Sequence, residues 1–246
     1  MQAYGVKGIP LINKGDDPAK AIINGLDESK ITLEDGDIVV VTEKIVAKAE
    51  GRLISLREVN PSENAVEIAE KTGKDPRLVE LILKESRKVL RYGKNFLIVE
   101  THHGFVCANA GIDQSNVPQG YAKLLPRSPD SSAASIRRSL EKAMGKRLGV
   151  VIADSFGRPF RRGSVGVAIG ASGVITLWDR RGEKDIYGKE LQVTRVAIAD
   201  CIASTATLLL GDADEEIPVV VIKGLNFLGD GEAKDLLRTR EEDIFR

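Results

Sequence analysis

The order of short strand-like runs along the chain is the feature that most restricts its fold. Residues 37–42 (DIVVVT) form a β-branched apolar run directly after a turn, a pattern typical of a buried strand. Apolar runs at 96–101 and 104–108 follow each other closely, and so do those at 163–169 and 174–178. Because strands in adjacent pairs are typical of antiparallel neighbours, we predict an α+β fold with mixed and antiparallel sheets and packed helices, rather than a doubly wound parallel sheet.

Two further strands and four helices complete this prediction. The runs 148–153 (LGVVIA) and 218–223 are predicted as strands, and residues 170–173 as the turn inside the second strand pair. Asp75-Pro76 and Ser128-Pro129 each place a capping residue before a proline, which is a helix-start signal. The expected helices span 75–91, 128–146, 190–210 and 232–245.

Composition limits the class of protein. The chain has 246 residues, enough to bury a sizeable core, and we expect one domain over 1–246 with a loosely defined helical subdomain near 60–95. Its 36 basic and 36 acidic residues cancel, so no electrostatic footprint for a nucleic-acid partner is present.

The apolar runs and the cysteines indicate in which cellular compartment we expect the protein. The longest apolar runs are too short to span a bilayer, and the N-terminal stretch lacks the pattern of a secretory signal. The two cysteines, Cys107 and Cys201, have no CxxC or metal-ligand spacing, so we expect both to be small buried hydrophobes. These observations predict a cytoplasmic protein with no membrane partner.

Familiar nucleotide motifs are missing from the sequence. It contains no GxxxxGK[ST], and the glycines of 163–170 (GSVGVAIG) do not have GxGxxG spacing. HExxH and GxSxG are also absent. Any nucleotide site must therefore be of another kind.

The segment 150–166 (VVIADSFGRPFRRGSVG) carries the strongest chemical signal. Asp154 and Ser155 lie where an apolar run ends, a position that fixes a side chain while leaving it open to ligand. Their oxygens are suited to Mg²⁺ or Mn²⁺ that carries phosphate. Arg161 and Arg162 follow closely, and arginine pairs with phosphate and carboxylate oxygens in a bidentate manner. The alternative is a turn-capping aspartate followed by solvated arginines.

A second polar loop follows another apolar run and contains Asp113 and Asn116. If Asp113 and Asp154 meet, two carboxylates about 4 Å apart would repel by roughly 4 kcal/mol at an effective dielectric constant near 20. Such a pair needs a metal ion or a shared proton. From the residues alone, both remain open to interpretation as turn aspartates.

Two smaller signals complete the list of candidate site residues. His102 and His103 are adjacent, so in a strand they would point to opposite faces and could not readily bind one ion together. The acidic stretch 212–216 is typical of a solvated loop, but it lies between a helical pattern and a strand. One member, Glu215, is our candidate for a further metal oxygen.

These segments together resemble the coenzyme F-420-0:L-glutamate ligase (gamma-glutamyl ligase) family over essentially the whole chain. Each stretch is a weak signal by itself, but six in the correct order are specific. The terminal EEDIFR is also similar to the family. The matching stretches are 8–17 (GIPLINKGDD), 35–51 (DGDIVVVTEKIVAKAEG), 104–117, 125–137 (LPRSPDSSAASIR), 151–173 and 191–224.

The resemblance implies an activity and a set of roles. It implies a GTP-dependent ligase that converts a carboxylate of F-420-0 to an acyl phosphate and joins it to L-glutamate, then adds a second, gamma-linked glutamate. It also implies Mg²⁺ or Mn²⁺, assistance by K⁺, GDP and phosphate as products, and a family-specific fold in an intertwined homodimer. Asp113, Asp154 and Ser155 would hold the metal, and the nucleotide would contact Ile9, Pro10, Leu11, Ile12, Thr42, Lys44 and Asn116.

Arg161 and Arg162 are the natural partners for the negative charge of F-420-0, and we assign them with Asp154 to the catalytic group. The sequence departs from the family pattern at Cys201, where relatives often carry glutamate, and at 164–166 (SVG), where they often have QTD. Two other classes stay open: a metal-dependent phosphohydrolase or phosphotransferase acting on a nucleotide, and a non-catalytic nucleotide-binding or scaffold protein.

Overall fold

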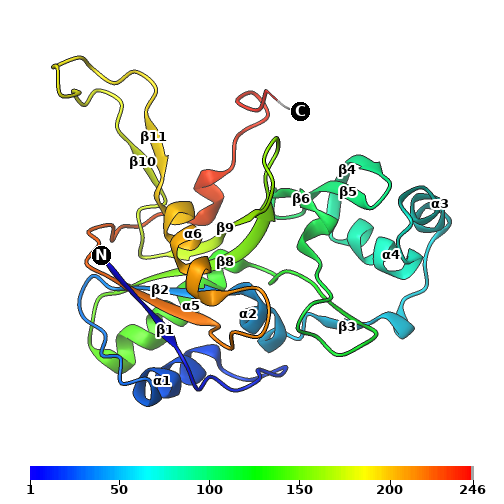
Figure 1. Cartoon of the computed structure of the whole chain (residues 1–246), viewed down its shortest axis with the longest axis horizontal. Helices are drawn as coiled ribbons and strands as arrows, with labels where there is room; N and C mark the ends of the chain where they lie inside the picture. Colours follow the sequence, from blue (N-terminus) through cyan, green and yellow to red (C-terminus); the bar gives the residue numbers. More distant parts are fainter. Residues whose placement is uncertain (245–246) are drawn as a thin grey trace.

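A five-stranded mixed sheet forms the centre of the molecule (Figure 1). The structure is a computed structural model that describes residues 1–244. Strands β2 and β8 are parallel neighbours, and every other pairing in this sheet is antiparallel. The predicted α+β class with mixed and antiparallel sheets is therefore confirmed. In sheet order the strands are β1 (Gln2–Val6), β12 (Val219–Lys223), β2 (Ile38–Thr42), β8 (Gly149–Gly157) and β9 (Ser164–Ser172).

Helices cover both faces of this sheet, which explains why its central strands are continuous apolar runs. Val39 and Val41 of β2 belong to a cluster with α1 (Pro18–Glu28), α2 (Glu43–Ala49) and α5 (Pro129–Met144). Ile38 and Val40 point to the other face and pack against α6 (Ile198–Leu210). Strands β2 and β8 are therefore fixed from both sides, and so are the side chains that follow them.

A second hydrophobic cluster lies beside the sheet and is built from residues 53–124. The predicted strand pair 96–101 and 104–108 forms β5 and β6 here. In Figure 1 these elements lie around the labels α3, α4, β3, β4, β5 and β6, on the side of the molecule away from α1. They are β3 (Leu53–Ser55), η1 (Leu56–Glu58), α3 (Glu63–Thr72), α4 (Pro76–Lys84), β4 (Ser86–Gly93), β5 (Phe96–Thr101), β6 (Val106–Ala108), η2 (Asn109–Gly111) and β7 (Tyr121–Lys123).

A two-stranded arm projects from the sheet body (Figure 1). It consists of β10 (Leu177–Asp179) and β11 (Arg195–Ala197), joined by residues 180–194. A short 3-10 turn, η3 (Ala233–Leu236), lies near the end of the chain. Across residues 1–244, no helix combines the length and the apolar character that crossing a membrane requires.

Two predicted helices are shorter than expected because part of each segment pairs as a strand. The helix expected over 75–91 ends at Lys84, since residues 86–93 form β4 against β5. The helix expected over 190–210 begins at Ile198, since residues 195–197 form β11 against β10. In both segments long-range backbone pairing prevails over the local helical pattern.

Three further elements differ from the prediction, and so does the end of β8, which continues to Gly157 although we expected the strand to end at residue 153. Strand β9 continues through residues 170–172, where we expected a turn, and the strand expected over 174–178 reduces to β10 after an isolated bridge at Val174. The helix expected over 232–245 is only the turn η3 and no regular helix follows within the described residues, while Phe245 lies outside them.

The register of β9 depends on a bulge that places two glycines on opposite faces. Ala153 pairs with Ala168 and Ile152 with Gly170, so β9 contains one extra residue at this point. A Cβ atom on Gly166 would lie 2.5 Å from the Ala203 carbonyl oxygen of α6, and one on Gly170 would lie 2.5 Å from the Pro129 carbonyl oxygen of α5. The absence of side chains thus lets both helices approach the strand.

We expect Gly170→Ala to lower the free energy of unfolding by about 1–3 kcal/mol, because the added methyl group must displace backbone of α5. Gly157→Ala is the matched control, since a Cβ atom there would meet nothing within 4 Å. Urea unfolding followed by circular dichroism measures both. Equal stability of the two variants would show that α5 does not constrain β9 in this way.

Candidate functional site

The parallel pairing of β2 and β8 brings two carboxylates to one edge of the sheet. Thr42 pairs with Ala153, so Glu43 and Asp154 occupy the next position along each strand direction. A cavity of about 1090 Å³ opens at this edge and is lined by Thr42, Asp154 and Ser155 among others. The edge at which parallel strands end is where open α/β sheets commonly bind ligands.

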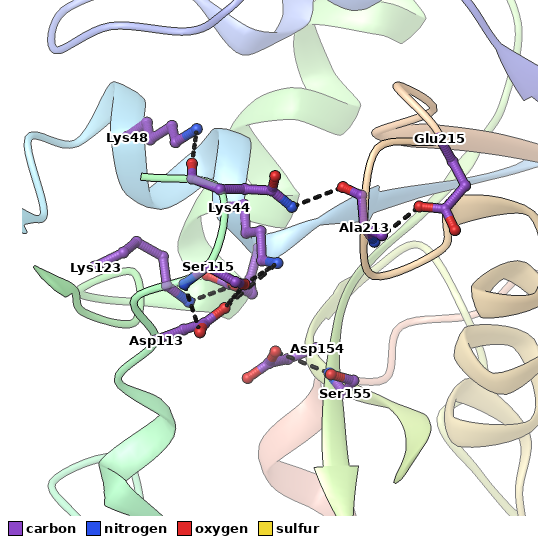
Figure 2. Close-up of polar contacts among 11 residues, drawn as sticks. Lys44, Lys48, Asp113, Ser115, Lys123, Asp154, Ser155, Ala213 and Glu215 are labelled. Carbon is purple, nitrogen blue, oxygen red and sulfur yellow. Dashed lines mark hydrogen bonds and ion pairs between the residues drawn. The ribbon is translucent and has the colours of Figure 1, made fainter. Parts of the chain in front are cut away.

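Asp113 reaches the same cavity from the second hydrophobic cluster. Its backbone is fixed by two hydrogen bonds with Lys123, of 3.0 and 2.8 Å. The Ser115 backbone N–H donates to Asp113 Oδ1 at 2.9 Å, and Lys44 Nζ lies 3.4 Å from Oδ2. Figure 2 shows Asp113 and Asp154 facing the same space from different elements. The structure therefore brings together the two aspartates that the sequence singled out.

The two aspartates have opposite electrostatic surroundings. Burial acts to raise the pKa of Asp113, but the Ser115 hydrogen bonds and the Lys44 charge outweigh it, so that pKa is lowered. Burial, and next the Glu43 carboxylate, raise the pKa of Asp154 to about 7, although Lys123 and the Ser155 backbone N–H act against this. A cation bound beside Asp154 would relieve the excess negative charge.

The residues present fit a divalent cation. Asp113, Asp154 and Ser155 supply hard oxygen donors. Within residues 1–244 no three His, Cys, Asp or Glu side chains form a ready-made metal cluster. Mg²⁺ commonly uses one or two carboxylates and completes its shell with water and substrate phosphates, so a two-aspartate site is sufficient.

Every residue predicted to contact a nucleotide lines this cavity. Apolar side chains come from the loop after β1, and Thr42 and Lys44 come from the β2–α2 junction. Lys48, one helical turn after Lys44, also lines the cavity and was not predicted. Burial, followed by the charge of Lys44, lowers the pKa of Lys48. The residues of the predicted set are Ile9, Pro10, Leu11, Ile12, Thr42, Lys44 and Asn116.

Asn116 connects two loops across the mouth of the cavity. Lys48 Nζ donates to the Asn116 carbonyl oxygen at 2.9 Å, and Asn116 Nδ2 donates to the Ala213 carbonyl oxygen at 2.9 Å (Figure 2). The Ala213 backbone N–H in turn donates to Glu215 at 2.8 Å. Loop 211–217 is thus tied to the loop that carries Asp113.

Glu215 lies differently from our expectation. Its carboxylate accepts the Ala213 N–H and packs over Gly211, and it does not line the cavity. The cavity is lined instead by Asp212, Asp214 and Glu216 of the same stretch. The sequence located the acidic loop, but only its folded conformation selects which carboxylates face the cavity.

Arg161 and Arg162 lie in the exposed loop between β8 and β9 and are not among the lining residues. Within this loop Arg158 Nη2 donates to the Arg162 carbonyl oxygen at 3.0 Å. The structure therefore does not bring these two guanidinium groups to the aspartates, and their role remains a prediction.

Two charged residues beneath the cavity were missed. Glu43 and Lys123 are each 1% exposed and form an ion pair. Glu43 directly follows a predicted buried strand, the same signal that identified Asp154, so the sequence could have indicated it. Lys123 carries no such signal, because its burial depends on contacts with α2.

The cysteines and histidines have no evident chemical role. Cys107 lines the cavity, but burial raises its thiol pKa to about 12, so it is not a nucleophile at neutral pH. Cys201 is exposed, so our expectation that it is buried was wrong; it lies on the solvent side of α6. His102 and His103 bond to different backbone carbonyls, of Lys84 and of Pro126.

The raised pKa of Asp154 predicts a pH-dependent stability. This carboxyl titrates near 7 when folded and near 3.9 when unfolded. Its protonated form favours folding, so that contribution is complete below about pH 4 and is lost as the pH rises through about 7. Without divalent cation, we expect Asp154→Asn to be more stable than the unchanged protein at pH 8, by about 1 kcal/mol or more.

Urea unfolding in the presence of a chelator, at pH 4, 6 and 8, measures this difference. It should shrink toward pH 4, whereas Asp27→Asn, at an exposed position of α1, should show no such trend. A variant less stable than the unchanged protein at pH 8 would mean that the neighbouring lysines fully compensate the Asp154 charge.

Comparison with known proteins identifies the family of this chain. Residues 7–224 match the family described as F420-0:Gamma-glutamyl ligase. A protein named coenzyme F420:L-glutamate ligase from Methanothermobacter thermautotrophicus is 55% identical over 249 residues, covering 100% of this chain and 99% of the relative. Proteins of the same name from Methanocaldococcus jannaschii and Archaeoglobus fulgidus are 55% and 47% identical, covering 87% and 100% of this chain and 86% and 96% of the relatives.

Proposed function

This chain belongs to the F420-0:gamma-glutamyl ligase family, and on that basis we propose that it joins L-glutamate to coenzyme F-420-0 in coenzyme F-420 biosynthesis, with GTP as the energy source. The observation that carries the proposal is the meeting of Asp113 and Asp154 in one cavity whose remaining wall contains every predicted nucleotide contact.

The cavity suits a nucleoside triphosphate in both shape and charge. Its apolar lip, from Ile9 to Ile12, can pack against a base or ribose, while Lys44 and Lys48 provide positive charge for phosphates. Phosphoryl transfer depends mainly on positioning and charge neutralisation, so no protein nucleophile is required. Mg²⁺ or Mn²⁺, held by Asp113, Asp154 and Ser155, would supply that neutralisation, and K⁺ would assist.

The reaction that we propose balances without a further reactant. A carboxylate oxygen of F-420-0 takes the γ-phosphoryl group of GTP and GDP leaves. The amine nitrogen of glutamate then attacks the acyl carbon, phosphate departs and the nitrogen loses a proton. For a second addition, the gamma-carboxyl of the attached glutamate would take the γ-phosphoryl group of a second GTP, and the amine of a second glutamate would then displace the phosphate. The tie between Asn116 and Ala213 would hold loop 211–217 over the nucleotide while these steps occur.

The arginine loop and the arm would contact partners outside the cavity. Arg161 and Arg162 are exposed and so are free to approach an incoming acid substrate, which would add negative charge. On the arm, Ile186, Tyr187 and Val193 are 91%, 88% and 85% exposed. Large apolar side chains rarely extend so far into water without a partner, and a second copy of the chain in a homodimer would cover them.

Mass spectrometry of the products tests the function directly. With F-420-0, L-glutamate, GTP and Mn²⁺, we expect product masses increased by one or two glutamate residues and the release of GDP. GTP consumption should require both acid and amino acid. Hydrolysis that proceeds without them would identify a nucleotide phosphohydrolase, and binding without any product would identify a non-catalytic protein.

We expect Asp113→Asn to reduce kcat/KM at least 100-fold, a loss of about 3 kcal/mol in transition-state stabilisation, because it removes a metal oxygen and the partner of Lys44. Asp27→Asn is the control, since it makes the same chemical change on the exposed surface of α1. Steady-state rates at saturating Mn²⁺ give the comparison. A near-normal rate for Asp113→Asn would place the metal elsewhere.

A further inference from the structure

The Glu43–Lys123 ion pair lies beneath the cavity and has no direct part in the function proposed above. Glu43 begins α2 and Lys123 ends β7, so the pair joins the sheet to the second hydrophobic cluster. Both side chains are 1% exposed. Glu43 Oε1 accepts from Lys123 Nζ, whereas Glu43 Oε2 is buried without a hydrogen-bond partner.

The buried pair is expensive to maintain. Transferring two charges from water to a protein interior is costly, and apolar residues of similar size often serve stability equally well or better. An unpartnered carboxylate oxygen adds to that cost. The pair therefore requires a reason other than stability, and its position beside the two aspartates indicates one.

Both charges are close enough to affect the aspartates. Lys123 exchanges two backbone hydrogen bonds with Asp113, and Glu43 follows Thr42, whose strand partner Ala153 directly precedes Asp154. Burial raises the pKa of Glu43, and the Lys123 ammonium in direct contact with Glu43 acts against this and favours the ionised form. Glu43 and Lys123 thus place one negative and one positive charge next to Asp113 and Asp154.

Opposite charges at one place have opposite effects on a bound cation. Glu43 attracts a divalent cation held by Asp113 and Asp154, and Lys123 repels it. In a buried site such effects are weakly screened by salt. Neither side chain lines the cavity, so each acts through the electric field and through the position of its backbone, without touching substrate.

We propose that Glu43 and Lys123 are positioning residues whose balanced charges set the affinity of the Asp113–Asp154 site for its divalent cation. This inference rests on the proposed function, because it assumes that the aspartates bind such a cation. With both charges present, the affinity of the site is high enough to bind a metal ion with the nucleotide and low enough to release that ion afterwards.

Calorimetric titration with Mn²⁺ alone tests the proposal, with thermal unfolding of each variant as the second measurement. Glu43→Gln leaves the Lys123 charge uncompensated, so Mn²⁺ binding should weaken at least tenfold. Glu43→Gln combined with Lys123→Met removes both charges and should bind within about threefold of the unchanged protein. Lys123→Met alone removes the opposing positive charge and should bind Mn²⁺ at least as tightly as the unchanged protein.

Lys223→Met provides the matched control. Lys223 Nζ lies 2.8 Å from Oδ2 of the buried Asp37, which stands at the opposite end of β2. The substitution therefore breaks a comparable ion pair that is far from Asp113 and Asp154 along the same strand. Its melting temperature should fall and its Mn²⁺ affinity should not change. A structural tether between Glu43 and Lys123 predicts a different result, in which all three variants of the pair lose Mn²⁺ affinity in proportion to their loss of melting temperature.

Three results would overturn the inference. Unchanged Mn²⁺ affinity in Glu43→Gln would show that the pair does not act on the site. A double variant as weak as Glu43→Gln would show that Lys123 has no opposing effect, and weaker binding by Lys123→Met would show the same if Glu43→Gln does not fold. Absence of Mn²⁺ binding by the unchanged protein would instead refute the proposed metal site itself, so the two failures are distinguishable.

Discussion

The parallel pairing of β2 and β8 is the constraint on which the site depends. It is the single parallel contact in the central sheet, and it makes both strands run toward the same edge. Thr42 ends β2 and Glu43 follows it, while Asp154 and Ser155 lie in β8 just beyond the residue that pairs with Thr42. Antiparallel pairing would have sent these residues to opposite edges. Helices on both faces hold the two strands rigidly, so the polar residues at their ends are positioned by a packed core.

Charge accumulates at this edge because separate parts of the chain contribute to it. The sheet provides Asp154, the second cluster provides Asp113, and their junction contains Glu43 and Lys123. Burial, and next the Glu43 carboxylate, raise the pKa of Asp154, whereas the Ser115 hydrogen bonds and the Lys44 charge lower that of Asp113. A site with this arrangement is suited to bind cations and phosphates that complete its charge balance.

The segments that we predicted wrongly show where a local sequence pattern is insufficient to predict secondary structure. Residues 86–91 continue the apolar spacing of α4, but their backbone groups pair with β5 and do not extend the helix. Residues 195–197 join the arm for the same reason. β9 continues past the turn that we expected, and the extra residue of the bulge beside Gly170 changes which of its side chains face each helix.

The sequence by itself determined the α+β class, most strands of the central sheet, and the two aspartates with the apolar and basic residues that share their cavity. The strands and the two aspartates follow from short-range signals, namely apolar runs, turn residues and polar groups that follow apolar runs, whereas the nucleotide-contact residues follow from the resemblance to a family. Only the tertiary structure decided that Asp113 and Asp154 meet, that Glu215 bonds to its own loop, and that Lys123 is buried against Glu43. Each of these facts depends on contacts between segments far apart in the chain, and a local pattern holds no information about which distant segment will supply the partner.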